Sequence, residues 1–197
     1  MSIDSSYFIG EITIPNLDKV GNQATLTSDI SFYEKEILMD ALGYQLYLEY
    51  TTAIAGESPA QKWLDLRDGA EFSFEFYGNT VTRKWIGLEN SDKVSLIAYY
   101  VYAMYIRKVS QTLTGVGMAV GQSENAQIVS GSRKMVNAWN RFIEQYGEVP
   151  DGFNSHWDSH YIHYDDKPTI YNFLLANSDD YDDWIYTRRE DINVGGF

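Results

Sequence analysis

All three histidines of this chain lie in segment 156–163, and three aspartates are close by in the sequence. The residues concerned are His156, Asp158, His160, His163, Asp165 and Asp166. Imidazoles and carboxylates are zinc and iron ligands, so this is the first place to look for metal chemistry. The spacing lacks the internal glutamate of H-E-x-x-H, and Pro150, Gly152 and Pro168 oppose a regular helix. We therefore expect an aromatic, solvated loop and no metal, with a metal-dependent hydrolase as an open alternative.

Two other segments carry ligand-binding residue types in an unfavourable arrangement. The glycines of 115–121 resemble a dinucleotide-binding turn, but such a turn leaves a strand, whereas this segment follows an expected helix. No Gly-Lys-Ser/Thr phosphate loop occurs in the chain. The acidic run 179–183 lacks the alternation that turns carboxylates around calcium. We expect a flexible connector, a solvated acidic run and no cofactor.

The elements around these segments have mostly helical periodicity. Apolar residues recur at helical spacing in 31–43, 46–56, 59–69, 91–109, 135–146 and 171–177. In contrast, Phe72, Phe74 and Phe76 alternate with polar residues before the turn sequence Gly78-Asn79, which predicts a β-hairpin over about 70–85. The fold class is therefore mainly α, a bundle-like domain with one hairpin. Its expected core includes Ile37, Leu38, Leu42, Leu46, Leu96, Ile97, Val101, Val136, Trp139 and Phe142.

Three parts are expected along the chain. Residues 1–15 are predicted to be an extended N-terminal arm, with Phe8 to Ile14 in an extended conformation, and 16–149 a helical domain with a long Gly- and Ser-rich loop at about 114–132. Residues 150–197 are predicted to be an acidic, aromatic docking segment. From Asp151 onward there are ten acidic and three basic residues.

Composition excludes several classes of protein. The net charge of −13 opposes a stable grip on nucleic-acid phosphates. The absence of cysteine excludes disulfides and thiolate sites. We find neither a signal peptide nor a long apolar run, and expect no membrane contact. Aromatic residues reach 15%, which favours protein interfaces.

Several stretches in a fixed order carry a family resemblance. They are Phe32–Leu38, Leu42–Tyr44, Leu96–Tyr102, Thr114–Gly117, Ser123–Asn125, Met135–Asn140 and Ile170–Leu174. In them the sequence resembles an uncharacterised family of phage and prophage proteins from Bacteroidetes-type hosts. That family looks like a divergent branch of the head-to-tail connector proteins of tailed phages, also called head-completion or adaptor proteins.

The resemblance implies a small helical virion subunit without an active site, assembled in the bacterial cytoplasm. Such subunits form a homo-oligomeric ring, usually a dodecamer, between the portal protein and neighbouring tail or ring proteins. The ring seals or extends the conduit through which DNA passes. The hairpin at 70–85 departs from the simplest helical connectors. The alternative to a ring subunit, besides the hydrolase, is a protein-binding module that uses an aromatic surface.

Contacts with neighbouring subunits or partners are expected from the tyrosine-rich helix, the glycine-rich loop and the C-terminal segment. The predicted interface residues are Tyr99, Tyr102, Thr114, Val116, Met118, Val120, Tyr181, Trp184, Ile185, Tyr186 and Phe197. Large apolar side chains in a short acidic segment would be unfavourable without a covering surface. Trp184→Ala is therefore expected to weaken assembly more than Asp182→Asn.

Overall fold

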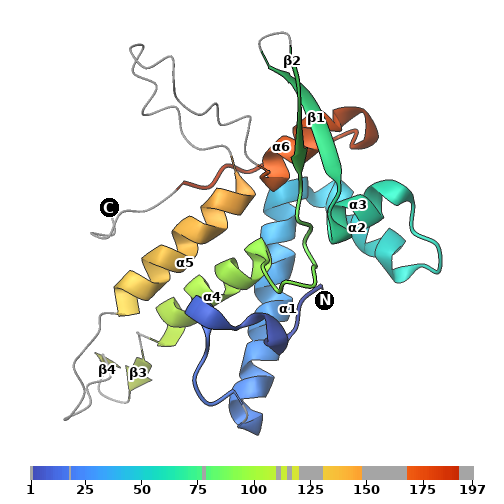
Figure 1. Cartoon of the computed structure of the whole chain (residues 1–197). Helices are drawn as coiled ribbons and strands as arrows, with labels where there is room; N and C mark the ends of the chain where they lie inside the picture. The colour runs from blue at the N-terminus through green and yellow to red at the C-terminus, as the bar shows by residue number, and fades with distance from the viewer. Residues whose placement is uncertain are drawn as a thin grey trace, which may run out of the picture.

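The computed structural model describes residues 2–17, 19–76, 79–109, 112–114, 117–119, 131–147 and 168–190. Its α-helices are α1 (Val20–Leu42), α2 (Tyr44–Ala55), α3 (Gln61–Asp68), α4 (Leu96–Val109), α5 (Gly131–Tyr146) and α6 (Ile170–Ala176). The long helix α1 packs against α4, and α4 runs beside α5 (Figure 1). The predicted mainly helical class is confirmed.

Helix α1 begins at Val20, well before the expected start at Ser31. Its first turns carry mainly polar, exposed residues, and only Leu26 and Ile30 reach the core there. The helix ends at Gly43, whose φ of 78° is readily adopted only without a side chain. Helix α2 starts directly afterwards, so Gly43 forms the corner between the two helices.

The expected hairpin is present as β1 (Glu71–Phe76) and β2 (Asn79–Lys84), paired antiparallel with Phe74 opposite Val81. At its base Phe72 is buried and its ring lies 5.9 Å from that of Phe173 in α6. This contact joins the hairpin to the helical body.

A second, shorter hairpin was not expected. Strands β3 (Thr112–Thr114) and β4 (Gly117–Ala119) pair antiparallel just after α4, at the start of the segment predicted as a loop. Figure 1 places this hairpin and the β1–β2 hairpin at opposite ends of the molecule. Within the described ranges the strands form only these two-stranded sheets. The remainder of the 114–132 loop lies outside the described residues.

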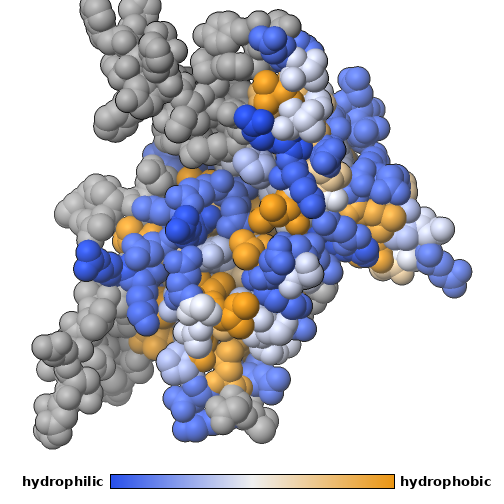
Figure 2. All heavy atoms as spheres, viewed as in Figure 1, coloured by the Kyte–Doolittle hydropathy of each residue, from blue (hydrophilic) through white to orange (hydrophobic). Residues whose placement is uncertain are grey.

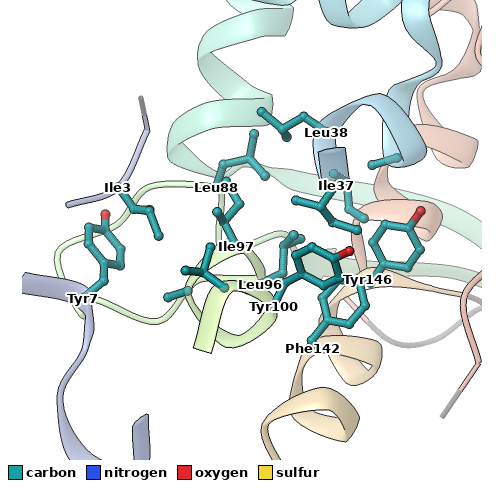
Figure 3. Close-up of a cluster of buried hydrophobic side chains, with 14 of the residues drawn as sticks. Ile3, Tyr7, Ile37, Leu38, Leu88, Leu96, Ile97, Tyr100, Phe142 and Tyr146 are labelled. Atoms are coloured by element: carbon teal, nitrogen blue, oxygen red, sulfur yellow. The ribbon is translucent and has the colours of Figure 1, made fainter. Parts of the chain in front are cut away.

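The core forms where α1, α4 and α5 meet. Figure 3 shows Ile37 of α1, Ile97 and Tyr100 of α4, and Phe142 and Tyr146 of α5 close together. All five side chains are fully or almost fully buried. Of the ten predicted core residues, only Trp139 is not fully buried, and it packs against the core. Burying each large apolar side chain contributes roughly 1.5–3 kcal/mol, so this junction stabilises the packing of the three helices.

The N-terminal segment 2–17 differs from the extended arm that alternation predicted. It contains two short 3-10 helices, Ser5–Tyr7 and Gly10–Ile12. The Asp4 carboxylate accepts a hydrogen bond from Ser6 N at 2.8 Å and caps the first of them. The segment lies along the helical body (Figure 1) and buries apolar side chains there. These are Ile3, Tyr7, Phe8, Ile12 and Ile14.

Candidate interaction surface

Residues 178–190, which we call the C-terminal strap, cross the body after α6 (Figure 1). At its start, Lys62 Nζ of α3 donates to Asp180 O at 2.6 Å. Further along, Thr187 N donates to Asp40 O near the end of α1 at 2.8 Å. At its far end, Trp139 Nε1 of α5 donates to Glu190 O at 2.7 Å. The strap therefore links three helices that are distant in sequence.

Aromatic side chains fasten the strap through their polar ends. Tyr181 Oη donates to Lys62 O at 2.7 Å, and Trp184 Nε1 donates to Ala41 O at 2.8 Å. From the body, Tyr146 Oη donates to Thr187 O at 2.6 Å. Burial raises the pKa of both Tyr146 and Tyr181, so these hydroxyls keep their protons and remain donors. Each ring thus combines apolar burial with a directed hydrogen bond.

The rings also form a continuous row from the body to the strap. Neighbouring centroids are 5.0 Å apart for Tyr100 and Phe142, 4.8 Å for Phe142 and Tyr146, and 5.1 Å for Tyr146 and Tyr186. Trp184 follows at 6.0 Å from Tyr186. These separations are typical of favourable aromatic pairs. Much of the high aromatic content is therefore used inside the chain.

Charged groups and two glycines complete the attachment. Arg189 pairs with Asp40, and its Nη2 lies 3.6 Å from Glu36 Oε1. Gly43 leaves room for the strap, because a Cβ there would lie 3.0 Å from the Cβ of Ile185. A methyl group at Gly147 would overlap the Tyr186 hydroxyl. The strap can lie this close only because both positions lack a side chain.

Where the strap crosses the α1–α2 corner, three apolar side chains face solvent. Tyr44 is 63% exposed, Leu48 39% and Ile185 68%. Tyr44 and Leu48 are four residues apart on α2 and share a face, and Ile185 lies over the adjacent Gly43. We call these three residues the corner patch. Most of the face seen in Figure 2 is hydrophilic, with hydrophobic residues in small groups.

The predicted interface residues of the tyrosine-rich helix are less accessible than expected. Tyr102 is buried, with 2% of its surface exposed, so it belongs to the core. Tyr99 is half-buried and donates to Glu11 Oε1 of the N-terminal segment at 2.8 Å. Thr114 ends β3 and Met118 lies in β4. Of the remaining predictions, Val116, Val120 and Phe197 lie outside the described residues.

The predicted interface residues of the C-terminal strap are also a mixture of buried and exposed side chains. Tyr181 is buried, and Trp184 and Tyr186 are half-buried against their own chain. Of the four, only Ile185 is largely exposed. The expectation that a neighbour must cover Tyr181, Trp184 and Tyr186 is therefore corrected, because the body covers them. Tyr44 and Leu48 of the corner patch were not anticipated, since their helical spacing looks the same as that of a buried stripe.

The described residues offer no metal centre. No group of three or more His, Asp or Glu side chains in the described part of the chain is placed to hold an ion. The histidine cluster at 156–163 lies outside that part. Among the described helices, none is long and apolar enough to cross a membrane.

Comparisons with known proteins gave no relative from which a function could be transferred. The chain matches no protein-family model, and the searches among curated proteins and solved structures found no match. A functional interpretation must therefore come from the sequence and the geometry.

Proposed function

We propose that this chain is a structural, non-enzymatic subunit of a ring in the portal-to-tail connector of a tailed phage. In this role it assembles with copies of itself, usually twelve in such rings, and contacts the portal protein and neighbouring tail or ring proteins. The ring seals or extends the DNA conduit of the virion. The proposal starts from the family resemblance of the sequence.

The observation that supports it best is the corner patch. A closed ring needs two unlike contact surfaces on each subunit, because the same heterologous interface repeats around the axis. The corner patch provides one candidate, built from α2 and the strap. Val109, 53% exposed at the end of α4, marks a second candidate beside the β3–β4 hairpin. In Figure 1 the end of α4 is well separated from the α1–α2 corner.

The charge of the chain fits the same role. A net charge of −13 repels DNA phosphates, so a conduit lined by such subunits would let DNA pass without binding it. A protein that holds DNA stably would instead need clustered lysine and arginine side chains. The proposal therefore includes no stable nucleic-acid binding.

The test is to measure the mass of particles formed by the chain alone and with the companion virion proteins. We expect a ring-sized species that is reduced in the Tyr44→Asp/Ile185→Asp variant, because each substitution places a charge in the patch. Thr25→Asp is the matched control, since Thr25 is exposed near the opposite end of α1. Equal assembly of the patch variant and the control would remove the corner patch from the interface. A strictly monomeric chain that never enters particles would overturn the ring itself.

The same measurement separates the proposal from a protein-binding module. A module would form a complex of fixed stoichiometry with a different protein and would not self-associate. A ring subunit must self-associate, with or without a portal to assemble on.

A further inference from the structure

The β1–β2 hairpin stands out from the helical body, and in the described part of the chain it pairs with no third strand (Figure 1). The outer edge of β1 and the outer edge of β2 therefore each present a row of backbone N–H and C=O groups. Another strand can bind to such an open edge through main-chain hydrogen bonds. No residue of the corner patch belongs to either edge.

The pairing inside the hairpin shows which residues direct their backbone groups outward. Trp85 N donates to Ala70 O at 2.8 Å, so these two residues form a hydrogen-bonded pair. Hydrogen-bonded and non-hydrogen-bonded pairs alternate along an antiparallel ladder, and residues of the second kind point their backbone groups away from the partner strand. The non-hydrogen-bonded pairs are Glu71 and Lys84, Ser73 and Thr82, and Glu75 and Thr80. All six side chains are exposed.

The two strands carry charges of opposite sign. Strand β1 has Glu71 and Glu75 and no basic residue. Strand β2 has Arg83 and Lys84 and no acidic residue. Like charges directly opposite each other destabilise a strand pair, whereas opposite charges stabilise it. Charged edges usually prevent strand pairing between molecules, but here the charges oppose only the pairing of two β1 edges or of two β2 edges.

We infer that the outer edge of β1 in one copy of this chain pairs with the outer edge of β2 in a second copy. The two strands of the hairpin run in opposite directions, so copies side by side in the same orientation bring antiparallel strands together. Pairing of two β1 edges would instead form a two-fold contact and bring glutamates together. The inferred contact joins unlike surfaces, as a ring requires, and it adds to the corner patch. The inference rests on the proposed self-association of the chain.

The hairpin itself shows that these side chains are compatible as neighbours. Inside it, Ser73 Oγ lies 3.0 Å from Thr82 Oγ1, and Glu71 lies opposite Lys84. One register between two copies pairs all three outward residues of β1 with all three of β2. That register repeats the same pairs across the junction, with Glu71 of one copy facing Lys84 of the other. Hydroxyl pairs and opposite charges at such positions stabilise a sheet.

The test is disulfide cross-linking of full-length single-cysteine variants, since the unmodified chain contains no cysteine. Ser73→Cys mixed with Thr82→Cys should give dimers linked between positions 73 and 82, at a several-fold higher yield than either variant alone. A hydrogen-bonded pair places its Cα atoms about 5.5 Å apart, which suits a disulfide. Thr25→Cys mixed with Thr82→Cys is the control, because Thr25 is exposed on α1. Peptide mass spectrometry identifies the linked positions.

Charge substitutions made in both cysteine variants test the role of the edges. Lys84→Glu should lower the yield several-fold, because both edges are then acidic. Glu71→Lys/Lys84→Glu should restore it, because the edge charges are exchanged. Lys35→Glu is the matched control, since Lys35 is exposed on α1 and its replacement changes the net charge equally. Urea unfolding shows whether each variant keeps its fold.

The mass of the particles, measured on the same samples, separates this inference from the proposed ring. Ring-sized particles without the link between positions 73 and 82 would overturn the inference but not the ring, whereas a strictly monomeric chain would overturn both. Efficient linkage of Ser73→Cys alone would show a two-fold contact of like edges and contradict the inference. Equal yields from Lys84→Glu and Lys35→Glu, or from the Thr25→Cys control mixture, would also contradict it.

Discussion

The N-terminal segment and the C-terminal strap both lie on the helical body, yet different forces hold them. The N-terminal segment inserts five apolar side chains, Phe8 among them, into the core. The strap adds to the packing of its aromatic rings a set of directed hydrogen bonds, most of them to backbone carbonyls, and the pairing of Arg189 with Asp40. Apolar burial is insensitive to pH, whereas directed bonds and ion pairs respond to pH and salt. The two attachments should therefore fail under different conditions.

Phe8→Ala should have the largest effect. Phe8 is 3% exposed, and truncating a buried phenylalanine usually costs about 3–5 kcal/mol of the free energy of unfolding. Ile9→Ala is the control, because Ile9 is 54% exposed and should change the free energy by about 0.5 kcal/mol or less. Urea unfolding measures both. Similar losses in the two variants would contradict attachment by burial of specific side chains.

Alkaline pH should weaken the strap next. Burial raises the pKa of Tyr146 and Tyr181 above the unfolded value of about 10. Their protonated forms therefore stabilise the fold below about pH 10, and this contribution is lost as pH rises toward the folded pKa. The loss at about pH 11 is up to roughly 1.4 kcal/mol for each tyrosine.

The measurement is the urea midpoint at pH 9 and pH 11. Tyr146→Phe/Tyr181→Phe should start lower at pH 9 and fall less between the two values. Tyr50 and Tyr99, whose pKa values burial raises to about 12, account for part of the remaining dependence. An unchanged pH dependence in the double variant would show that the two hydroxyls do not hold the strap.

A single strap hydrogen bond should matter less. Tyr146→Phe keeps the ring but removes the donor to Thr187 O, at a cost of about 0.5–1.5 kcal/mol. Limited proteolysis should then cut the chain faster near Thr187, without faster cleavage in the N-terminal segment. Faster cleavage at both ends would mean that the two attachments are coupled.

The smallest effect is expected from Arg189→Lys. The variant keeps the charge near Asp40 and Glu36 but loses the planar donor pair, at about 0.5 kcal/mol. Added salt should reduce the difference from the unmodified chain, because a partly exposed ion pair is screened. A difference that persists in high salt would indicate lost packing of the arginine side chain rather than charge.

Local patterns predicted the helical body and the first hairpin correctly. The helical spacing of Ile97 and Val101 predicts a helix, and the turn residues Gly78-Asn79 predict a hairpin. Both patterns lie within a few neighbouring residues, so they can be recognised without knowing the fold. The start of α1 was missed because residues 20–30 are mostly polar and exposed, so only packing of Leu26 and Ile30 reveals that helix. The 3-10 helices near the N-terminus depend on turn chemistry at Asp4 and Gly10 rather than on periodicity.

The strap could not be predicted because its partners are remote in sequence. Trp184 bonds to Ala41 across 143 positions, and Arg189 bonds to Asp40 across 149. The sequence singled out the aromatic side chains of the strap as anchors on a neighbouring subunit, whereas Tyr181 and Trp184 bond to Lys62 and Ala41 of their own chain. It could not reveal that their binding surface belongs to the same chain. The corner patch was missed because Tyr44 and Leu48 have the helical spacing of a buried stripe. The sequence therefore could not show that these two side chains are exposed.

The position of the strap in the sequence also has a consequence for synthesis. Every element that it covers, including the ends of α1 and α5, is synthesised before residues 178–190. Until then the carbonyls of Lys62 and Ala41 must be hydrated, and the ring of Tyr146 lacks its cover. Contacts between residues so far apart close late, and the nascent chain is most open to chaperones or to wrong partners during that interval. Closure of the strap therefore coincides with the end of the interval in which the growing chain is vulnerable.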